Sequence, residues 1–151
     1  MDSGVKRIAV GADHAGFVLK KQIVDFLKEE KYDIVDLGTH STESVDYPDY
    51  AEKVAEAVGK GEVSRGLLVC YSGIGMDITA NKVKGVRAGL CLTPKLAELS
   101  RQHNDTNVLC LASGFTTLEA AKEIVKTWLS TSFEGGRHAR RVDKIKDYEN
   151  Q

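Results

Sequence analysis

The order of apolar runs along the chain constrains its fold more than any other feature. Five short runs are separated by longer stretches in which apolar residues recur every three or four positions. The runs lie at residues 6–13, 32–37, 67–70, 86–92 and 108–111. Strands that alternate with helices form a parallel sheet with helices on both faces. The sequence therefore predicts an α/β protein, a three-layer doubly wound fold with a five-stranded parallel sheet.

Helical periodicity marks the segments between the predicted strands. The first has an apolar stripe at positions 19, 23, 26 and 27, and Pro48 opens the second, where its missing N–H costs little. Further helices are predicted over residues 76–82, 94–102 and around 121–128, with a polar, basic last helix over 137–148 and a connector at 103–105. No repeat or linker divides the chain, so residues 1–151 are expected to form a single domain.

Composition narrows the class of protein. With 42% hydrophobic and 28% charged residues, a formal net charge of -1 and a pI near 6.4, the chain has no global attraction to nucleic acid or anionic membranes. No apolar run is as long as a transmembrane span, and the first residues lack the pattern of a signal peptide. Three widely spaced cysteines form no disulfide framework. We therefore expect a cytoplasmic protein without nucleic-acid or membrane partners.

The third strand runs into the segment with the clearest chemical signal. Residues 72–75, Ser-Gly-Ile-Gly, break the strand before helix-forming residues begin at Met76. A strand, a glycine turn and a helix start leave backbone N–H groups available to an anion. Cys70 ends the strand at the mouth of this turn, where such groups favour a thiolate. A reactive group beside an anion cradle predicts an enzyme.

Other interpretations of this turn are weaker. The dinucleotide motif would need glycine at Ile78, and no Gly-Lys-Ser/Thr follows as it does in a P-loop. The four histidines stand apart and the cysteines form no C-x-x-C pair, so no metal and no cofactor are expected. Taken alone, Cys70 is more often a small buried hydrophobe than a catalyst. Its place at the strand end favours the catalytic interpretation.

Polar residues also follow the first two strands. Asp13 and His14 come after the first strand, and Tyr47 lies in the segment after the second. In doubly wound folds, ligands bind beyond the carboxyl ends of the strands near a switch in strand order. We therefore expect these side chains to converge with Cys70 and Ser72, although Asp13 alone would be interpreted as a helix cap.

The last helix has a pair of arginines one turn apart. Arg137 and Arg141 are spaced i, i+4, so both guanidinium groups share one helix face. That spacing suits a phosphate dianion held by two charge-assisted contacts. Taken alone, such a cluster is more often a solvated face, and His103 alone is more often a helix C-terminal residue favoured by the dipole.

Ordered motifs lie at residues 11–16, 44–48, 70–75, 80–82, 100–105 and 135–138, over nearly the whole chain. Together they resemble the type B ribose-5-phosphate isomerase family, which also includes isomerases of allose 6-phosphate, galactose 6-phosphate and tetrulose phosphates. The resemblance implies a metal-independent aldose–ketose isomerase acting through a cis-enediolate, with ribose 5-phosphate and ribulose 5-phosphate as the first candidates. It also implies a homodimer or dimer of dimers whose active sites are shared between chains.

The resemblance implies a role for each matching residue. Cys70 matches the base that moves a proton between C1 and C2, the turn with Ser72 matches the cradle of the enediolate oxygens, and His103 matches the residue that helps to open the furanose ring. His14, Arg137 and Arg141 match phosphate-side positions. The full set of expected substrate contacts is Asp13, His14, Tyr47, Tyr71, Gly73, Ile74, Gly75, Asn104, Arg137 and Arg141.

Two positions depart from the family pattern. Tyr71 stands where the family usually has glycine, and Gly114 stands where a phosphate-contacting arginine is usual. These departures bear on which sugar phosphate is bound more than on the reaction type. An isomerase of a hexose or tetrulose phosphate is therefore the alternative within the enzyme class. Outside it, the alternative is a non-catalytic sugar-phosphate or nucleotide binding module in which Cys70 is a plain core residue.

Overall fold

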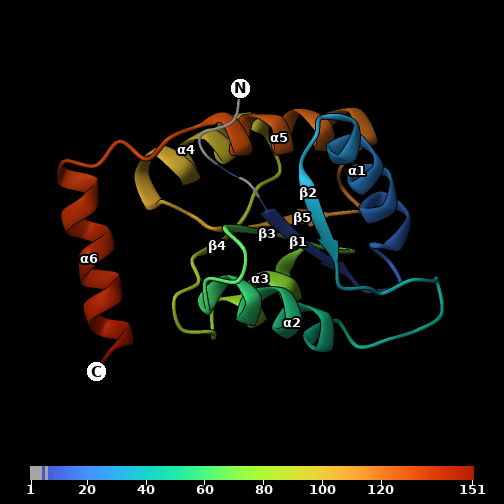
Figure 1. Cartoon of the computed structure of the whole chain (residues 1–151), viewed down its shortest axis with the longest axis horizontal. Coiled ribbons are helices and arrows are strands. Elements are labelled where there is room, and N and C mark those ends of the chain that lie inside the picture. The colour runs from blue at the N-terminus through green and yellow to red at the C-terminus, as the bar shows by residue number, and fades with distance from the viewer. Residues whose placement is uncertain (1–4, 6) are drawn as a thin grey trace.

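In a computed structural model that describes residue 5 and residues 7–151, the predicted strands form one parallel sheet with the order β2-β1-β3-β5-β4 (Figure 1). The α/β class and the five-stranded parallel sheet are thus confirmed. Lys6, at the start of the first predicted strand, lies outside the described residues. The strands are β1 (Arg7–Ala12), β2 (Asp33–Asp36), β3 (Arg65–Cys70), β4 (Ala88–Leu90) and β5 (Val108–Ala112).

Helices cover both faces of the sheet and create two separate cores (Figure 1). On one face lie α1 (Phe17–Glu29), α4 (Pro94–Asn104) and α5 (Leu118–Ser130), and on the other lie α2 (Tyr47–Gly59) and α3 (Ile74–Ala80). Because successive strand residues point to opposite faces, Leu67 and Val69 enter the first core while Leu68 and Cys70 enter the second. The side chain of Cys70 therefore faces α2 and α3.

The last helix, α6 (Arg137–Glu149), stands beside the sheet rather than on it (Figure 1). It contacts α4 near its start and buries only His138 and Val142. Most of its surface is left open. Among the described helices, none combines the length and the apolarity that crossing a bilayer requires.

The strand order places a switch point between β1 and β3. From β1 the chain moves to β2 on one side of the sheet, and it returns to β3 on the other side. The loops that follow β1 and β3 are therefore neighbours, and the N–H of Asp13 donates to the carbonyl of Val69 at 3.3 Å. In open α/β sheets a ligand crevice forms at such a point.

The boundaries of α3 and α4 differ by two residues from those predicted. α3 begins at Ile74 rather than Met76, because Gly73 adopts a left-handed conformation with φ 76° as its N-cap. The prediction that residues 103–105 form a connector is wrong for the first two, which complete the last turn of α4. The helix ends there because Asp105 is left-handed, with φ 48°.

The strand predicted over residues 86–92 is shorter in the structure, where β4 covers only residues 88–90. Just before β4, the N–H of Val86 donates to the carbonyl of Val83, and the N–H of Arg87 donates to the side-chain oxygen of Asn107. Local turn contacts therefore replace the first rungs of the ladder at this edge of the sheet.

Lys20 on α1 fixes the segment that follows β2. Its side chain is 1% exposed, and its Nζ donates to both carboxylate oxygens of Asp36, at 2.7 and 2.9 Å, and to the carbonyl of Thr39 at 2.7 Å. Partial burial acts to raise the pKa of Asp36, but the hydrogen bonds from Lys20 and from the N–H of Gly38 outweigh it and hold that pKa below 3.8.

Replacing Lys20 by methionine should lower the free energy of unfolding by about 2–3 kcal/mol at pH 7, because two acceptors lose their buried donor. The loss is smaller than for a fully buried pair since Asp36 is partly exposed. The contribution exists above pH 3.8 and declines as pH falls below it, because the folded pKa of Asp36 is lowered.

Urea denaturation measures this effect, and Lys21→Met on the exposed face of α1 is the matched control, expected within about 0.5 kcal/mol of wild type. Equal losses for the two variants would contradict the structural role of Lys20.

Candidate active site

The loop after β1 presents two polar side chains at the switch point. The carboxylate of Asp13, a residue that is 7% exposed, accepts the N–H of Gly16 at 3.0 Å and fixes the turn into α1. The Nδ1 of His14 accepts the N–H of Val45 at 3.1 Å. A neutral His14 ring must then hold its proton on Nε2, which makes Nε2 a donor. The same bond ties the segment before α2 to this loop.

Cys70 is the last residue of β3 and lies at the carboxyl edge of the sheet. Its carbonyl accepts the N–H of Ser113 at 2.9 Å, which pairs the ends of β3 and β5. All three cysteines are free thiols, with Cys70 5%, Cys91 2% and Cys110 0% exposed. Burial raises the pKa of Cys91 and raises that of Cys110 much further. Those two thiols are therefore core groups, as predicted, although Cys91 lies just beyond β4 rather than within it.

The turn after Cys70 requires glycine at position 73. Gly73 has φ 76°, a conformation that L side chains rarely adopt. A Cβ there would also lie 2.4 Å from the side chain of Leu90 and 3.2 Å from the carbonyl oxygen of Leu111. The backbone of this turn is thus pressed against the ends of β4 and β5.

The turn presents backbone donors next to the thiol. The hydroxyl of Ser72 accepts the N–H of Ile74 at 3.3 Å. Asp77 donates the first i→i−4 bond of α3, so the N–H groups of Gly75 and Met76 precede the bonded part of the helix. An anionic oxygen beside Cys70 would meet these groups.

Two tyrosine rings pack against glycines near the turn, one against Gly75 in α3 and one against Gly114 after β5. A Cβ on Gly75 would be 2.5 Å from the ring of Tyr47, and a Cβ on Gly114 would be 2.4 Å from the ring of Tyr71. Tyr47 is 40% exposed and Tyr71 is 60% exposed. The bulky residue at position 71 therefore does not fill the turn, because its ring leaves the turn and lies over the end of β5.

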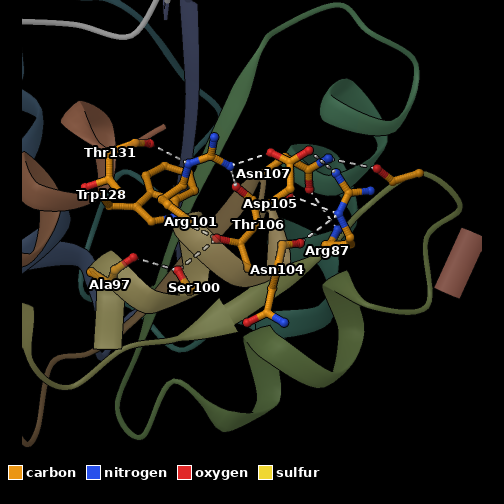
Figure 2. A network of polar contacts seen from close by, with 11 residues as sticks. Arg87, Ala97, Ser100, Arg101, Asn104, Asp105, Thr106, Asn107, Trp128 and Thr131 are labelled. Carbon is orange, nitrogen blue, oxygen red and sulfur yellow. Dashed lines mark hydrogen bonds and ion pairs between the residues drawn. The ribbon is translucent and has the colours of Figure 1, made fainter. Parts of the chain in front are cut away.

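His103 and Asn104 lie on the side of the amino ends of the strands, opposite to Cys70. They form the last turn of α4, where the Nε of Arg87, just before β4, donates to the carbonyl of Asn104 at 3.2 Å. Figure 2 shows the side chain of Asn104 pointing away from this contact. Since β5 rises about 13 Å between the two edges of the sheet, one chain cannot bring His103 or Asn104 to Cys70.

A buried polar network fixes the end of α4 (Figure 2). The carboxylate of Asp105 accepts hydrogen bonds from Nη1 of Arg101 at 2.8 Å and from Nη2 of Arg87 at 3.3 Å. Arg101 also donates to the carbonyl of Thr106 at 2.6 Å, and the indole N–H of Trp128 donates to the Thr106 hydroxyl at 2.9 Å. The network joins α4, α5 and the start of β5, so the backbone of residues 103 and 104 has a defined position.

His138 stacks on His103, a contact that sequence reasoning missed. The ring centroids are 4.2 Å apart and the planes differ by 10°. Nε2 of His138 is buried, lies 3.6 Å from Oε1 of Glu134, and has no hydrogen-bond partner among the described residues. Burial, the neighbouring His103 and Arg137 hold the pKa of His138 below 6.5, so it is neutral at pH 7. The only sequence signal was its place in the motif at residues 135–138.

His103, Glu134 and His138 place potential metal-ligand atoms within 4.8 Å of one another. An imidazole binds a metal through a lone pair in its ring plane. The two nearly parallel rings do not direct those lone pairs to a common point. As they lie, the two histidines form a stacked pair rather than a chelate.

Arg137 and Arg141 lie one turn apart on α6, and both are exposed. Neither forms an ion pair within the described part of the chain. Gly135 and Gly136, with φ 70° and 56°, turn the backbone into α6, and the N–H of Glu134 donates to the carbonyl of Gln102. The arginines are thereby held on the same side of the molecule as His103.

The predicted site residues thus fall into two groups, one at the carboxyl ends of the strands (the carboxyl edge) and one on the side of their amino ends (the amino edge). The carboxyl-edge group consists of Asp13, His14, Tyr47, Cys70, Tyr71, Ser72, Gly73, Ile74 and Gly75. The amino-edge group consists of His103, Asn104, Arg137 and Arg141.

Known proteins share this fold and about half of its aligned residues. The family model described as Ribose/Galactose Isomerase matches residues 8–145. Ribose-5-phosphate isomerase B of Escherichia coli is 52% identical over 93% of this chain and 95% of its own. The solved ribose-5-phosphate isomerase B of Clostridium thermocellum has a TM-score of 0.94 at 51% identity, covering 95% of this chain and 97% of that one. The Mycoplasma genitalium protein, solved with bound ribulose-5-phosphate, has a TM-score of 0.93 at 46% identity, covering 96% and 97%.

The three thiols should differ in reactivity. Iodoacetamide at pH 8 should alkylate Cys70 faster than Cys91 and Cys110, because burial raises the pKa of both core thiols and lowers the fraction of each that is present as thiolate. Peptide mapping by mass spectrometry measures the three rates, and labelling in concentrated urea, where the rates should become equal, is the control. Equal and slow labelling in the folded protein would place Cys70 among the core residues.

Proposed function

Because the chain belongs to the ribose/galactose isomerase family, we propose that it interconverts ribose 5-phosphate and ribulose 5-phosphate. The observation on which this proposal rests is the free thiol of Cys70 at the end of β3, followed by a turn that leaves the backbone N–H groups of Gly75 and Met76 unbonded. Aldose and ketose differ in which of C1 and C2 is the carbonyl carbon. Their interconversion needs a base for one proton and donors for an enediolate, and this turn offers both.

In the proposed reaction, the Cys70 thiolate removes the proton from C2 of the open-chain aldose. The two oxygens of the cis-enediolate face the N–H groups of Gly75 and Met76 and the hydroxyl of Ser72. Returning the proton to C1, while the O2 proton moves to O1, gives the ketose. Each fixed donor to the developing oxyanion stabilises the transition state by about 3–4 kcal/mol. One base serves both carbons because C1 and C2 present the same face of the planar cis-enediolate to it.

The closed furanose must open before this step. We assign ring opening to His103, which can move a proton between the O1 hydroxyl and the ring oxygen. Its stacking on His138 fixes the plane of the imidazole, and the lowered pKa of His138 disfavours a positive charge on that neighbouring ring. Asn104 follows on the same helix turn as a further sugar contact.

The phosphate is assigned to Arg137, Arg141 and His14. The two exposed guanidinium groups share one face of α6, and His14 has a donor at Nε2. A charge-assisted hydrogen bond contributes about 1.5–3 kcal/mol, so these groups would supply much of the binding energy.

A second copy of the chain is needed to bring the two groups together. A hollow of about 790 Å³ lies between α6 and the edge strand β4, and Leu96, Ile145 and Tyr148 line it with exposed apolar surface. We infer a homodimer, alone or within a dimer of dimers, in which this region receives the partner. In a two-fold dimer, the amino-edge group of each copy can complete the carboxyl-edge group of the other.

The proposed enzyme is a single domain that acts in the cytoplasm and uses no metal or cofactor, because each step is a proton transfer between side chains and substrate. Nucleic acid and membranes are not among its proposed partners. Isomerisation of another sugar phosphate is the second candidate, because Tyr71 and Gly114 change the surroundings of the thiol.

Hybrid dimers test the activity and the shared site together. Wild type should isomerise ribose 5-phosphate, and Cys70→Ala should fall below about a hundredth of that rate because it lacks the base. Arg137→Ala/Arg141→Ala should also be nearly inactive. A purified hybrid of these two chains has one intact site, so it should recover about half of the wild-type activity per dimer.

The control hybrid pairs wild type with a chain that has all three substitutions. If sites are shared, both of its sites are damaged and it stays inactive. An active control hybrid with an inactive test hybrid would place each site within one chain. A wild-type protein that converts no phosphorylated tetrose, pentose or hexose would contradict the proposed enzyme and favour a binding module.

A further inference from the structure

The contact between Tyr71 and Gly114 has an unusual form. Three atoms of the Tyr71 ring lie 2.4, 2.5 and 2.7 Å from the place where a Cβ of residue 114 would stand. Real Cβ atoms do not approach so closely, so the ring occupies the volume that any side chain at this position would need. The conformation of Tyr71 therefore depends on the absence of a side chain at residue 114.

The backbone holds the two residues in register. The N–H of Gly114 donates to the carbonyl of Tyr71 at 2.9 Å, and the N–H of Ser113 donates to the carbonyl of Cys70 at the same distance. Phe115 meets the Tyr71 ring edge-on, with centroids 5.5 Å apart and planes at 66°. The glycine below the ring and the aromatic neighbour at its side thus leave the ring one favoured place, over the end of β5.

Tyr71 and Gly114 also line a hollow of about 310 Å³ between the loop after β5 and α1. Val18, Gln22 and Thr116 form other parts of its wall. The Thr116 hydroxyl is buried and has no hydrogen-bond partner within the described ranges. The hollow therefore offers space and a polar atom, and the Tyr71 ring stands at its border.

We infer that Tyr71 and Gly114 act as one specificity-determining pair. The ring, seated on the bare Cα of Gly114, closes the β5 side of the sugar site and restricts it to five-carbon sugar phosphates. Six-carbon sugar phosphates would need the space that the ring occupies. This inference rests on the proposed isomerase function. It assigns to the pair a choice of substrate and leaves the proton transfer to Cys70.

The physical reason lies in how pockets discriminate by size. One methylene more or less in a fitted hydrophobic pocket changes kcat/KM by roughly 10- to 200-fold, and the CHOH unit that a hexose adds to a pentose is larger than a methylene. Such discrimination needs a wall that does not move, and the glycine contact and Phe115 hold the ring in place. A single Cβ at residue 114 would remove that support, because the ring is 60% exposed and would move outward rather than disturb the core.

The test compares wild type, Gly114→Ala, Tyr71→Gly and the double variant on ribose 5-phosphate and allose 6-phosphate. Gly114→Ala should lower kcat/KM for the pentose and raise the hexose-to-pentose ratio, each by about tenfold, since it displaces the ring. Tyr71→Gly should raise the ratio at least as much, mainly through a lower KM for the hexose. In the Tyr71→Gly background, adding Gly114→Ala should change neither quantity by more than about twofold, because no ring remains to be displaced.

Two results would overturn the inference. One is a hexose-to-pentose ratio that stays at the wild-type value in Tyr71→Gly. The other is an effect of Gly114→Ala that is the same in both backgrounds. Thermal unfolding of each variant separates these results from loss of fold, and Tyr71→Gly decides the question even if Gly114→Ala does not fold. A wild type inactive on every sugar phosphate would instead contradict the proposed function, so the two failures are distinguishable.

Discussion

The arrangement of the site depends on the pairing of β3 with β1 on one side and β5 on the other. This pairing makes Cys70 a strand end that neighbours the loops after both other strands. It also forces the chain to leave β3 through a left-handed glycine pressed against Leu90 and Leu111. A thiol and unbonded backbone donors therefore meet at one point without any long loop to position them. Rigid elements of this kind hold reactive groups more accurately than loops do.

The same sheet sets a limit on what one chain can do. Its strands separate the carboxyl-edge group from the amino-edge group by about 13 Å, and the polar network around Asp105 holds the second group at its own edge. Flexibility of one side chain does not span that distance. The catalytic proposal therefore depends on the dimer proposal, because His103 and the two arginines of α6 would reach Cys70 only from another copy. The open side of α6 and the apolar hollow beside β4 are where that copy would bind.

Local sequence patterns were sufficient for the order of strands and helices and for the presence of a glycine turn after β3, because period and glycine placement act over a few residues. They failed at the end of α4, where the helix continues to Asn104 until left-handed Asp105 stops it. They also could not show Tyr71 on Gly114 or His138 on His103, since both contacts join residues far apart in the chain. Two residues that departed separately from a family pattern are thus one packing unit. Only the folded chain reveals it.

The central claim is that Cys70 isomerises the sugar by removing a proton and returning it through an enediolate. Running the reaction in deuterium oxide and following it by NMR tests this most directly, because a proton held by the thiol can exchange with solvent. The account predicts deuterium at C1 of ribulose 5-phosphate and at C2 of the recovered ribose 5-phosphate at equilibrium, and none with Cys70→Ala. Ketose formed over many turnovers without solvent deuterium would show that hydrogen moves directly between the carbons, and it would contradict the account.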